Sequence, residues 1–228
     1  MAKVQKQPSF TYKAQDVWSA AAAAFRVNQG YVKDPLYDYN PESGVKLLLK
    51  DANKRLIGAM LMINAGWNDD DVALGEESRS YWQAGIMKML ADQKLSDFDK
   101  MAITLSEKEE INTFYDIAVI GSLIGAAKRG QAREDVEYAK RADPGNWIGK
   151  VDEKVHLDNL IVVSCVYSIN YGSYRNEGTQ NGNYVSWWGK VKLEPGQVLN
   201  VNARVKAQVT DAKTGAKVTQ VNYLKAVK

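Results

Sequence analysis

Hydrophobic and polar positions in the first half of the chain follow mainly helical spacing. Lys13 to Asn28 predicts a helix, because it contains the run Ala20 to Ala24, which has the highest helix propensity available, and because Gly30 follows as a stop signal. Glu76 to Leu90 predicts another helix, since its large apolar residues recur on one face. The front half is therefore expected to be rich in helix.

Between these helices the apolar runs are shorter and are separated by residues typical of turns. Tyr31 to Gly44 is rich in Asp-Pro, Asn-Pro and Ser-Gly pairs, which are typical of turns. The short apolar runs Val45 to Leu49 and Leu56 to Ile63 flank a polar turn and favour a β-hairpin, with a helix as the alternative for such a run. Met101 to Leu105 is expected to be a short strand.

Two further helices are expected before position 143. Ser106 and Glu109 match the capping-box spacing, so Ser106 is expected to cap a helix that runs to about Arg129. A more polar helical stretch, Gln131 to Arg141, then stops before Pro144.

After Pro144 the pattern changes from helical spacing to alternation and β-branched residues. Val155 to Ile169 is apolar on both faces, as in a central strand, and three alternating segments follow it. The Gly-, Asn- and Ser-rich segment Tyr171 to Asn183 is expected to be a loop. The alternating strands are expected at Tyr184 to Leu193, Val198 to Val209 and Val218 to Val227.

These patterns predict an α+β fold. Residues 1–149 form a mixed helix and hairpin portion, and residues 150–228 form an antiparallel β-meander. We expect the helix-rich portion to pack on this sheet in one compact domain, and the sheet to be of a kind that can close into an OB-like barrel.

Composition fits a packed globular chain, and charge adds one asymmetry. The net charge is only +3, but positions 150–228 carry 11 Lys and Arg against 6 Asp and Glu, whereas the positions before 150 carry 19 against 21. The basic surplus of the C-terminal part is compatible with a polyanionic partner.

Cysteine content and hydropathy indicate the compartment. Cys165 has no second cysteine with which to form a disulfide, which fits the cytoplasm or any other compartment in which thiols stay reduced. No apolar run approaches the roughly 20 residues that a membrane helix needs, so no membrane association is expected. The start of the chain has no apolar core of a secretory signal and is expected to be a polar arm.

Catalytic and metal-binding patterns are missing from the sequence. His156 and Cys165 are the only histidine and cysteine, too few for a zinc site of the ordinary type. They lie at odd spacing in one predicted strand and so are expected to point to opposite faces. The acidic run Asp69 to Asp71 lacks the alternation and distal Glu of a calcium loop and is expected to be a solvated loop before a helix. Nucleotide-binding glycine motifs and a serine-nucleophile elbow are also absent. We therefore expect a binding protein without a cofactor rather than an enzyme.

Aromatic and basic side chains gather in the C-terminal strands. Alternation places Tyr184, Trp188, Lys190 and Lys192 on one face of their strand, and Arg204 and Lys206 on the outward face of the next. If these two strands pair, their outer face becomes a basic surface with aromatic rings at one end. The preceding loop adds Tyr171, Tyr174 and Arg175. Cations that track phosphates and rings on which bases stack are what single-stranded nucleic-acid binders use.

Three other interpretations stay open. Any antiparallel sheet with one solvated face shows alternating Lys, Arg, Asn and Gln, and Tyr184 and Trp188 could pack beneath a helix of the N-terminal part. The same sheet could serve protein contacts in a structural or assembly protein. The fold could also bring carboxylates together into a catalytic pocket that the sequence does not reveal.

The helical front half and the Tyr-, Trp- and Lys-rich strands of the back half resemble the single-stranded-DNA-binding RNA polymerase cofactors (Drc) of lytic podoviruses that carry a virion RNA polymerase. This resemblance covers the whole chain in general character. It implies a homo-oligomer that coats phage single-stranded DNA and assists the phage RNA polymerase in the host cytoplasm.

One feature departs from many bacterial and phage single-strand binders, which end in an acidic tail that recruits partner enzymes. The last residues here, Leu224 to Lys228, are basic and strand-like. Recruitment of partners would then need another surface, for which the acidic segment Asp69 to Glu77 is a candidate.

Overall fold

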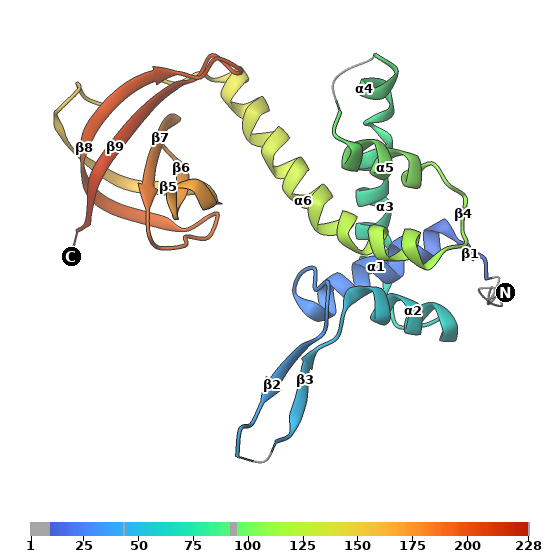
Figure 1. The fold of residues 1–228 in the computed structure, drawn as a ribbon. Coiled ribbons are helices and arrows are strands. Elements are labelled where there is room, and N and C mark those ends of the chain that lie inside the picture. Colours follow the sequence, from blue (N-terminus) through green and yellow to red (C-terminus); the bar gives the residue numbers. More distant parts are fainter. Residues whose placement is uncertain (1–9, 43, 92–94, 228) are drawn as a thin grey trace. The chain divides into compact units, whose positions relative to one another are not determined.

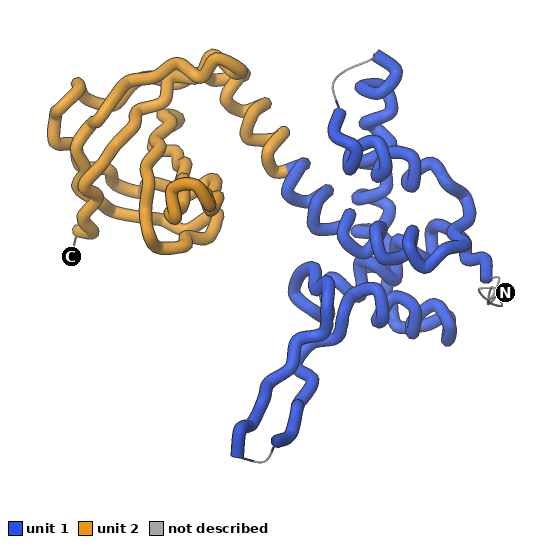
Figure 2. The backbone as a smooth tube through the Cα atoms, in the orientation of Figure 1, with its two compact units in different colours: residues 1–131 blue, residues 132–228 orange. Residues whose placement is uncertain are grey.

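The computed structural model describes residues 10–42, 44–91 and 95–227, and it divides into two compact units, residues 1–131 and 132–228 (Figure 2). The division comes before the expected boundary at 149 and gives two units where one domain was expected. It lies inside helix α6 (Phe114–Ala142), whose last turns belong to the second unit. The polar arm expected at the start of the chain lies outside the described residues.

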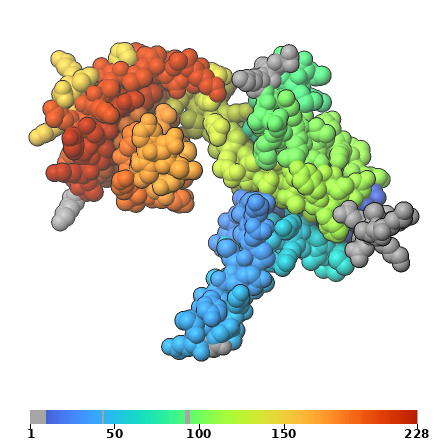
Figure 3. Space-filling model, in the orientation of Figure 1, coloured from blue at the N-terminus to red at the C-terminus, as the bar shows by residue number. Residues whose placement is uncertain are grey.

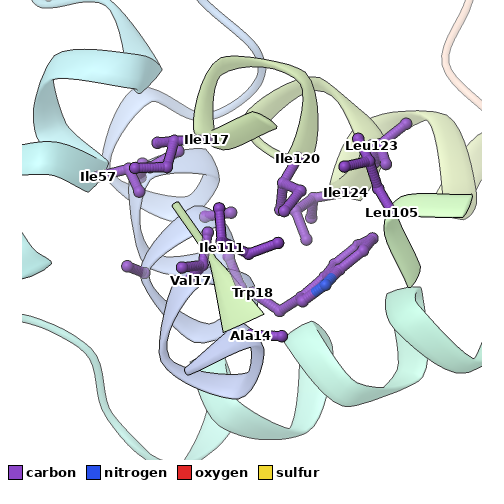
Figure 4. Close-up of a cluster of buried hydrophobic side chains, with 14 of the residues drawn as sticks. Ala14, Val17, Trp18, Ile57, Leu105, Ile111, Ile117, Ile120, Leu123 and Ile124 are labelled. Atoms are coloured by element: carbon purple, nitrogen blue, oxygen red, sulfur yellow. The ribbon is translucent and has the colours of Figure 1, made fainter. Parts of the chain in front are cut away.

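Unit 1 is built from helices around a shared apolar core (Figure 1). Its central helix is α1 (Ala14–Asn28), as the alanine run predicts, and Ala20 to Ala24 are fully buried there. Trp18 and isoleucines of α2 and α6 complete this core, as Figure 4 shows. The other helices of the unit are α2 (Asn53–Ile63), α3 (Asp69–Gln83), α4 (Ile86–Leu90), α5 (Asp97–Ser106) and the first part of α6. A short antiparallel strand pair, β1 (Tyr12–Lys13) with β4 (Glu110–Ile111), connects the segment before α1 to the segment before α6.

A β-hairpin is present in unit 1, but not between the segments that the sequence favoured. Strand β3 (Lys46–Lys50) pairs antiparallel with β2 (Leu36–Tyr39), which lies in the segment expected to contain only turns. The run Leu56 to Ile63 belongs to helix α2, the alternative interpretation, because Ile57 and Leu61 pack into the helical core at a spacing of four residues. The hairpin stands out from the helices of its unit (Figure 3).

Two helix starts also differ from expectation. Met101 to Leu105 lies within α5 rather than in a strand, and Ser106 is the buried last residue of that helix rather than a cap of the next. The capping boxes are formed instead by Asn68 with Asp71 and by Ser96 with Asp99. The expected acidic loop Asp69 to Asp71 is thus the first turn of α3, where carboxylates are favoured by the helix dipole.

Unit 2 is a closed barrel of five strands, which confirms the α+β class and the OB-like shape. Around the barrel the order is β5-β6-β7-β9-β8, with β8 pairing back onto β5. All neighbouring pairs are antiparallel except β7 with β9, which is parallel. The strands are β5 (Lys154–Ser168), β6 (Ser173–Gln180), β7 (Asn183–Gly189), β8 (Val198–Thr210) and β9 (Lys217–Ala226).

The barrel corrects two expectations about strand pairing. The segment expected to be a loop contains strand β6, which pairs with β5 on one side and β7 on the other. Its Gly178 lies where a Cβ atom would come within 2.8 Å of the Ile161 carbonyl oxygen, so the closely packed strand requires glycine there. Strands β7 and β8, expected to pair, are separated by β9.

Alternation along the strands sorts their side chains as expected in β8. Val201, Ala203 and Val205 are buried, while Arg204 and Lys206 are exposed. Leu157, Leu160, Val162, Val185, Trp187 and Val221 complete the apolar interior of the barrel. Within unit 2, the end of α6 is held to the outside of β6 by an ion pair between the buried Lys140 and the half-buried Glu177, 2.7 Å apart. No helix among the described residues is long and apolar enough to cross a membrane.

Candidate nucleic-acid interface

The outer face of strands β6 and β7 carries an exposed pair formed by one cation and one large aromatic ring. Arg175 and Trp188 are directly opposite each other in the β6–β7 register, so their side chains lie on the same face. The Trp188 side chain is 48% exposed, whereas its neighbour Trp187 is buried in the barrel. Strand alternation therefore directs one tryptophan into the core and the next into solvent.

The turn between β5 and β6 adds a second ring to this face. Residues Ile169–Tyr171 form a short 3-10 turn that ends at Gly172, whose positive φ of 53° closes it. The turn places the Tyr171 ring 4.9 Å from the Trp188 ring, centroid to centroid, and leaves Tyr171 70% exposed. Together the two rings present an apolar aromatic surface beside Arg175.

Two lysines extend the positive charge around these rings. The Lys190 ammonium donates to the carbonyl oxygen of Gly172 at 3.1 Å, which holds it next to the turn that carries Tyr171. Lys206 of β8 lines the same hollow as Arg175 and Trp188, a cavity of about 210 Å³ that also includes Gln220. Among the residues that the structure describes, none forms a hydrogen bond or ion pair with the Lys206 ammonium. We call Tyr171, Arg175, Trp188, Lys190 and Lys206 the Trp188 cluster.

Glu177 sets the net charge next to this cluster. One of its carboxylate oxygens accepts from Arg175 at 3.1 Å, and the other accepts from the buried Lys140 at 2.7 Å. One carboxylate is thus shared by two cations, so the trio keeps a positive charge. An approaching phosphate would meet Arg175 in a position already fixed by this hydrogen bond.

Tyr174 does not join the cluster. It neighbours Arg175 in β6 and therefore points to the other face of the sheet. Its ring meets that of Tyr167 edge-on, with centroids 5.1 Å apart, and Tyr167 is 54% exposed. The expectation that Tyr174 and Arg175 contribute to one surface is wrong, although a second aromatic pair, of exposed Tyr167 with half-buried Tyr174, results.

Tyr184 is also removed from the exposed surface. Its hydroxyl donates to the carbonyl oxygen of Asp143 at 3.1 Å, and the Lys140 ammonium lies 5.6 Å from the centre of its ring. Burial under this end of α6, followed by the nearby Asp143 carboxylate, raises the pKa of the Tyr184 phenol. Of the alternative that Tyr184 and Trp188 pack beneath a helix of the N-terminal part, only the packing of Tyr184 is found, and the end of α6 that covers it belongs to the barrel unit. Trp188 is exposed.

Lys192 and Arg204 lie apart from the Trp188 cluster. Lys192 follows strand β7 and forms an exposed ion pair with Glu194 at 2.7 Å, which raises the pKa of the lysine. Arg204 is paired with Asp152 at 3.2 Å and lines a different cavity with Lys154 and Lys225. Because β9 separates β7 from β8, the single basic surface expected from their pairing does not form.

His156 and Cys165 belong to no metal-binding group in the part of the chain that the structure describes. No group of three or more His, Cys, Asp and Glu side chains that could hold a metal occurs among the described residues. His156 is engaged by Asp158 at 2.7 Å and by Asn202 at 2.8 Å. The Cys165 sulfur accepts a hydrogen bond from the backbone of Leu193 at 3.4 Å.

Several exposed residues of this barrel are not identified by sequence reasoning. Tyr167 lies in a long apolar strand, where its pattern predicts burial, and Lys154 and Lys225 lie at strand ends that carry no motif. Tyr223 is exposed because of a local change in strand register.

No protein-family profile, curated protein or solved structure matches this chain.

Proposed function

We propose that the barrel binds single-stranded DNA without sequence preference. The observation that carries this proposal is the Trp188 cluster, in which two exposed rings 4.9 Å apart lie near three cations, Arg175 of β6, Lys190 just after β7 and Lys206 of β8. OB-fold barrels bind oligonucleotides on the corresponding face, formed by their second and third strands and the loop between strands one and two.

The chemistry of the cluster suits a flexible polyanion with aromatic bases. Every base has an apolar face that can stack on Trp188 or Tyr171, so stacking tolerates any sequence. Arg175, Lys190 and Lys206 would neutralise phosphates and release counterions, which makes binding weaker at higher salt. A duplex keeps its bases stacked on each other and offers no such faces, so single strands are preferred.

The resemblance in sequence character extends the proposal to a biological role. On that basis the protein would support phage transcription or replication in the host cytoplasm, with a phage RNA polymerase as a partner. The Asp69 to Glu77 segment remains a candidate contact for such a partner, although the Asp71 carboxylate is already bound to Arg26.

A tryptophan-fluorescence titration tests the binding proposal. A single-stranded homopolymer should quench the emission, a matching duplex should not, and the apparent affinity should fall as salt rises. Trp188→Ala should weaken binding about tenfold or more, given that stacking contributes roughly 1–3 kcal/mol per base.

Trp147 provides a matched control for that variant. It is 42% exposed on the same barrel but lies under the Lys217 ammonium rather than beside the cluster. Trp147→Phe should bind single strands like the unchanged protein. If neither polynucleotide changes the emission at low salt, the proposal is wrong.

A structural or assembly role is the second candidate, and the β2–β3 hairpin is the observation that favours it. Large apolar side chains on this hairpin are between 47% and 62% exposed, on both of its faces. At about 200 Å² for a full side chain, they present on the order of 700 Å² of apolar surface, close to the roughly 800 Å² per partner of a standard interface. These residues are Leu36, Tyr37, Tyr39, Val45, Leu47, Leu48 and Leu49. The occupant that we propose is a second copy of the chain, which agrees with an oligomeric single-strand binder.

A further inference from the structure

A second basic cavity lies on the barrel, formed by strands β5, β8 and β9. It has a volume of about 500 Å³. Its lining includes Lys154, Arg204 and Lys225, together with His156, Asn202 and Tyr223. None of these residues except Arg204 carries a predicted binding role, and none lines the hollow of the Trp188 cluster.

Tyr223 reaches this cavity because β9 contains an irregularity. Arg204 of β8 pairs with Asn222, whereas Asn202 pairs with Lys225, so Tyr223 and Leu224 together face the single residue Ala203. Two residues opposite one define a β-bulge, which often re-aims a side chain. Tyr223 accordingly has a positive φ of 54°, which is uncommon for an aromatic residue, and it is 74% exposed.

The bulge also has a packing reason. Val221 and Leu224 both pack into the barrel interior although they are three positions apart, which a regular strand with a period of two does not allow. The extra residue changes the parity between them and leaves Tyr223 outward, on the side of Arg204. The barrel core thereby holds an aromatic ring at the edge of a basic cavity.

The charges of the cavity favour an anionic ligand. Asp152 pairs with Arg204 at 3.2 Å, so the charge of Arg204 is already offset, and the Asp158 carboxylate lies 2.7 Å from the His156 ring. By contrast, no described residue forms a hydrogen bond or ion pair with the ammonium groups of Lys154 and Lys225. Two lysines without a hydrogen-bond or ion-pair partner among the described residues thus line the same cavity as an exposed aromatic ring. This is the chemistry of the Trp188 cluster, built here from different residues.

The two sites are joined along strand β8. Lys206 lines the hollow of the Trp188 cluster, and Arg204 lines the second cavity. They are two positions apart in β8 and both are exposed, although the pairing with β9 is irregular at Lys206. Two positions of a strand span at most about 7 Å. A flexible polyanion that leaves the first site at Lys206 therefore meets the second site next.

We propose that this cavity is a second subsite for the same single strand, with one base stacked on Tyr223 and phosphates bound by Lys154 and Lys225. The inference rests on the proposed function. It adds a path by which the single-stranded DNA leaves the Trp188 cluster and crosses β9 and β8. It predicts that the barrel occupies more nucleotides than the Trp188 cluster alone can contact.

Binding of oligonucleotides of two lengths tests this path. For a deoxythymidine strand of about 12 nucleotides, within the range that one OB fold covers, Tyr223→Ala and Lys225→Gln should each lower affinity about fivefold to tenfold. For a strand of about 4 nucleotides, which the Trp188 cluster can hold alone, neither substitution should change affinity. Trp188→Ala should lower the affinity for the oligonucleotides of both lengths.

Matched variants show whether lost affinity comes from the Tyr223 ring and the Lys225 charge themselves or from any change of a surface side chain. Tyr223→Phe keeps the ring and should bind like the unchanged protein, and Lys100→Gln removes one exposed lysine of helix α5 and should change affinity less than twofold. Should Tyr223→Ala and Lys225→Gln bind the long strand normally while Trp188→Ala weakens it, the second subsite is refuted and the proposed function stands. Absence of binding by the unchanged protein at either length refutes both.

Discussion

At the scale of single residues, the best-defined interaction in unit 1 is the ion pair between Arg26 and Asp71. The Arg26 guanidinium donates two hydrogen bonds to the carboxylate, at 2.8 Å and 2.7 Å, and the Asp71 side chain is only 2% exposed. The carboxylate also accepts from the backbone of Asn68 in the capping box. The hydrogen bond from Arg26, above all, lowers the pKa of Asp71, which burial alone would raise.

We predict that Asp71→Asn destabilises the protein by about 2 kcal/mol at pH 7, a value reduced because Arg26 is half-exposed. A carboxyl group with a depressed pKa stabilises the folded state above its unfolded pKa of about 3.9 and ceases to do so as pH falls through the folded value. The difference between variant and unchanged protein should therefore shrink between about pH 5 and pH 2. Urea unfolding at several pH values measures it.

Asp70→Asn is the control, because Asp70 lies in the same helix turn but is exposed. It should change the free energy of unfolding by less than about 0.5 kcal/mol. If the loss caused by Asp71→Asn is as large at pH 2.5 as at pH 7, then the shape of the side chain rather than its charge is responsible.

At the scale of elements, glycines allow helices to approach closely. A Cβ atom on Gly75 of α3 would lie 2.8 Å from the backbone carbonyl carbon of Trp18 in α1. Gly121 and Gly125 of α6 are similarly close to side chains of Ile57 and Phe25, at 2.9 Å and 2.8 Å. Gly121 and Gly125 therefore form a surface on which α6 packs closely against α2 and α1.

Gly75→Ala and Gly58→Ala should have opposite effects on stability. Both glycines lie in helices of unit 1, so either substitution removes a propensity cost of about 1 kcal/mol. Gly58 has no atom within 4 Å of its added Cβ, so Gly58→Ala should raise the melting temperature. Gly75→Ala should lower it, because the contacted atoms are backbone and separation of α1 from α3 costs about 1–3 kcal/mol. Circular dichroism on heating compares the two, and a gain in stability for both would show that α1 and α3 can separate without cost.

At the scale of the whole molecule, the exposed hairpin should determine oligomeric state. An isolated two-stranded hairpin is only marginally stable in water, and an exposed apolar surface of this size is typical of an interaction site. We predict that the protein is larger than a monomer by light scattering coupled to size exclusion. Replacing Leu47 and Leu49 with Ser should shift the mass toward that of the monomer, 25.4 kDa.

Met62→Ser is the control for that variant, since Met62 is 81% exposed but lies at the end of α2 rather than in the hairpin. Its mass in solution should match that of the unchanged protein. If the unchanged protein is a monomer at all accessible concentrations, the prediction that it self-associates through the hairpin is wrong. Under the proposed function, each monomer would then bind DNA on its own.

Local patterns were sufficient for several elements and for part of the candidate site. The alanine run predicts α1, and alternation predicts β8 and its outward Arg204 and Lys206, because helix propensity and strand period depend on neighbouring residues. The same alternation separates Trp187 from Trp188, so the ring at the centre of the proposed interface could be identified from sequence.

Other features depend on contacts between residues far apart in the chain. Strand β6 forms in a Gly- and Asn-rich segment because β5 and β7 both pair with its backbone, and closure of the barrel places β9 rather than β8 beside β7. The exposure of Tyr223 follows from the need of Val221 and Leu224 to reach one core. Sequence by itself thus determined the α+β class, the basic and aromatic character of the second half and the identity of its rings. Only the tertiary structure decided which rings and cations share a face, because that choice depends on strand register and closure, which arise from non-local pairing.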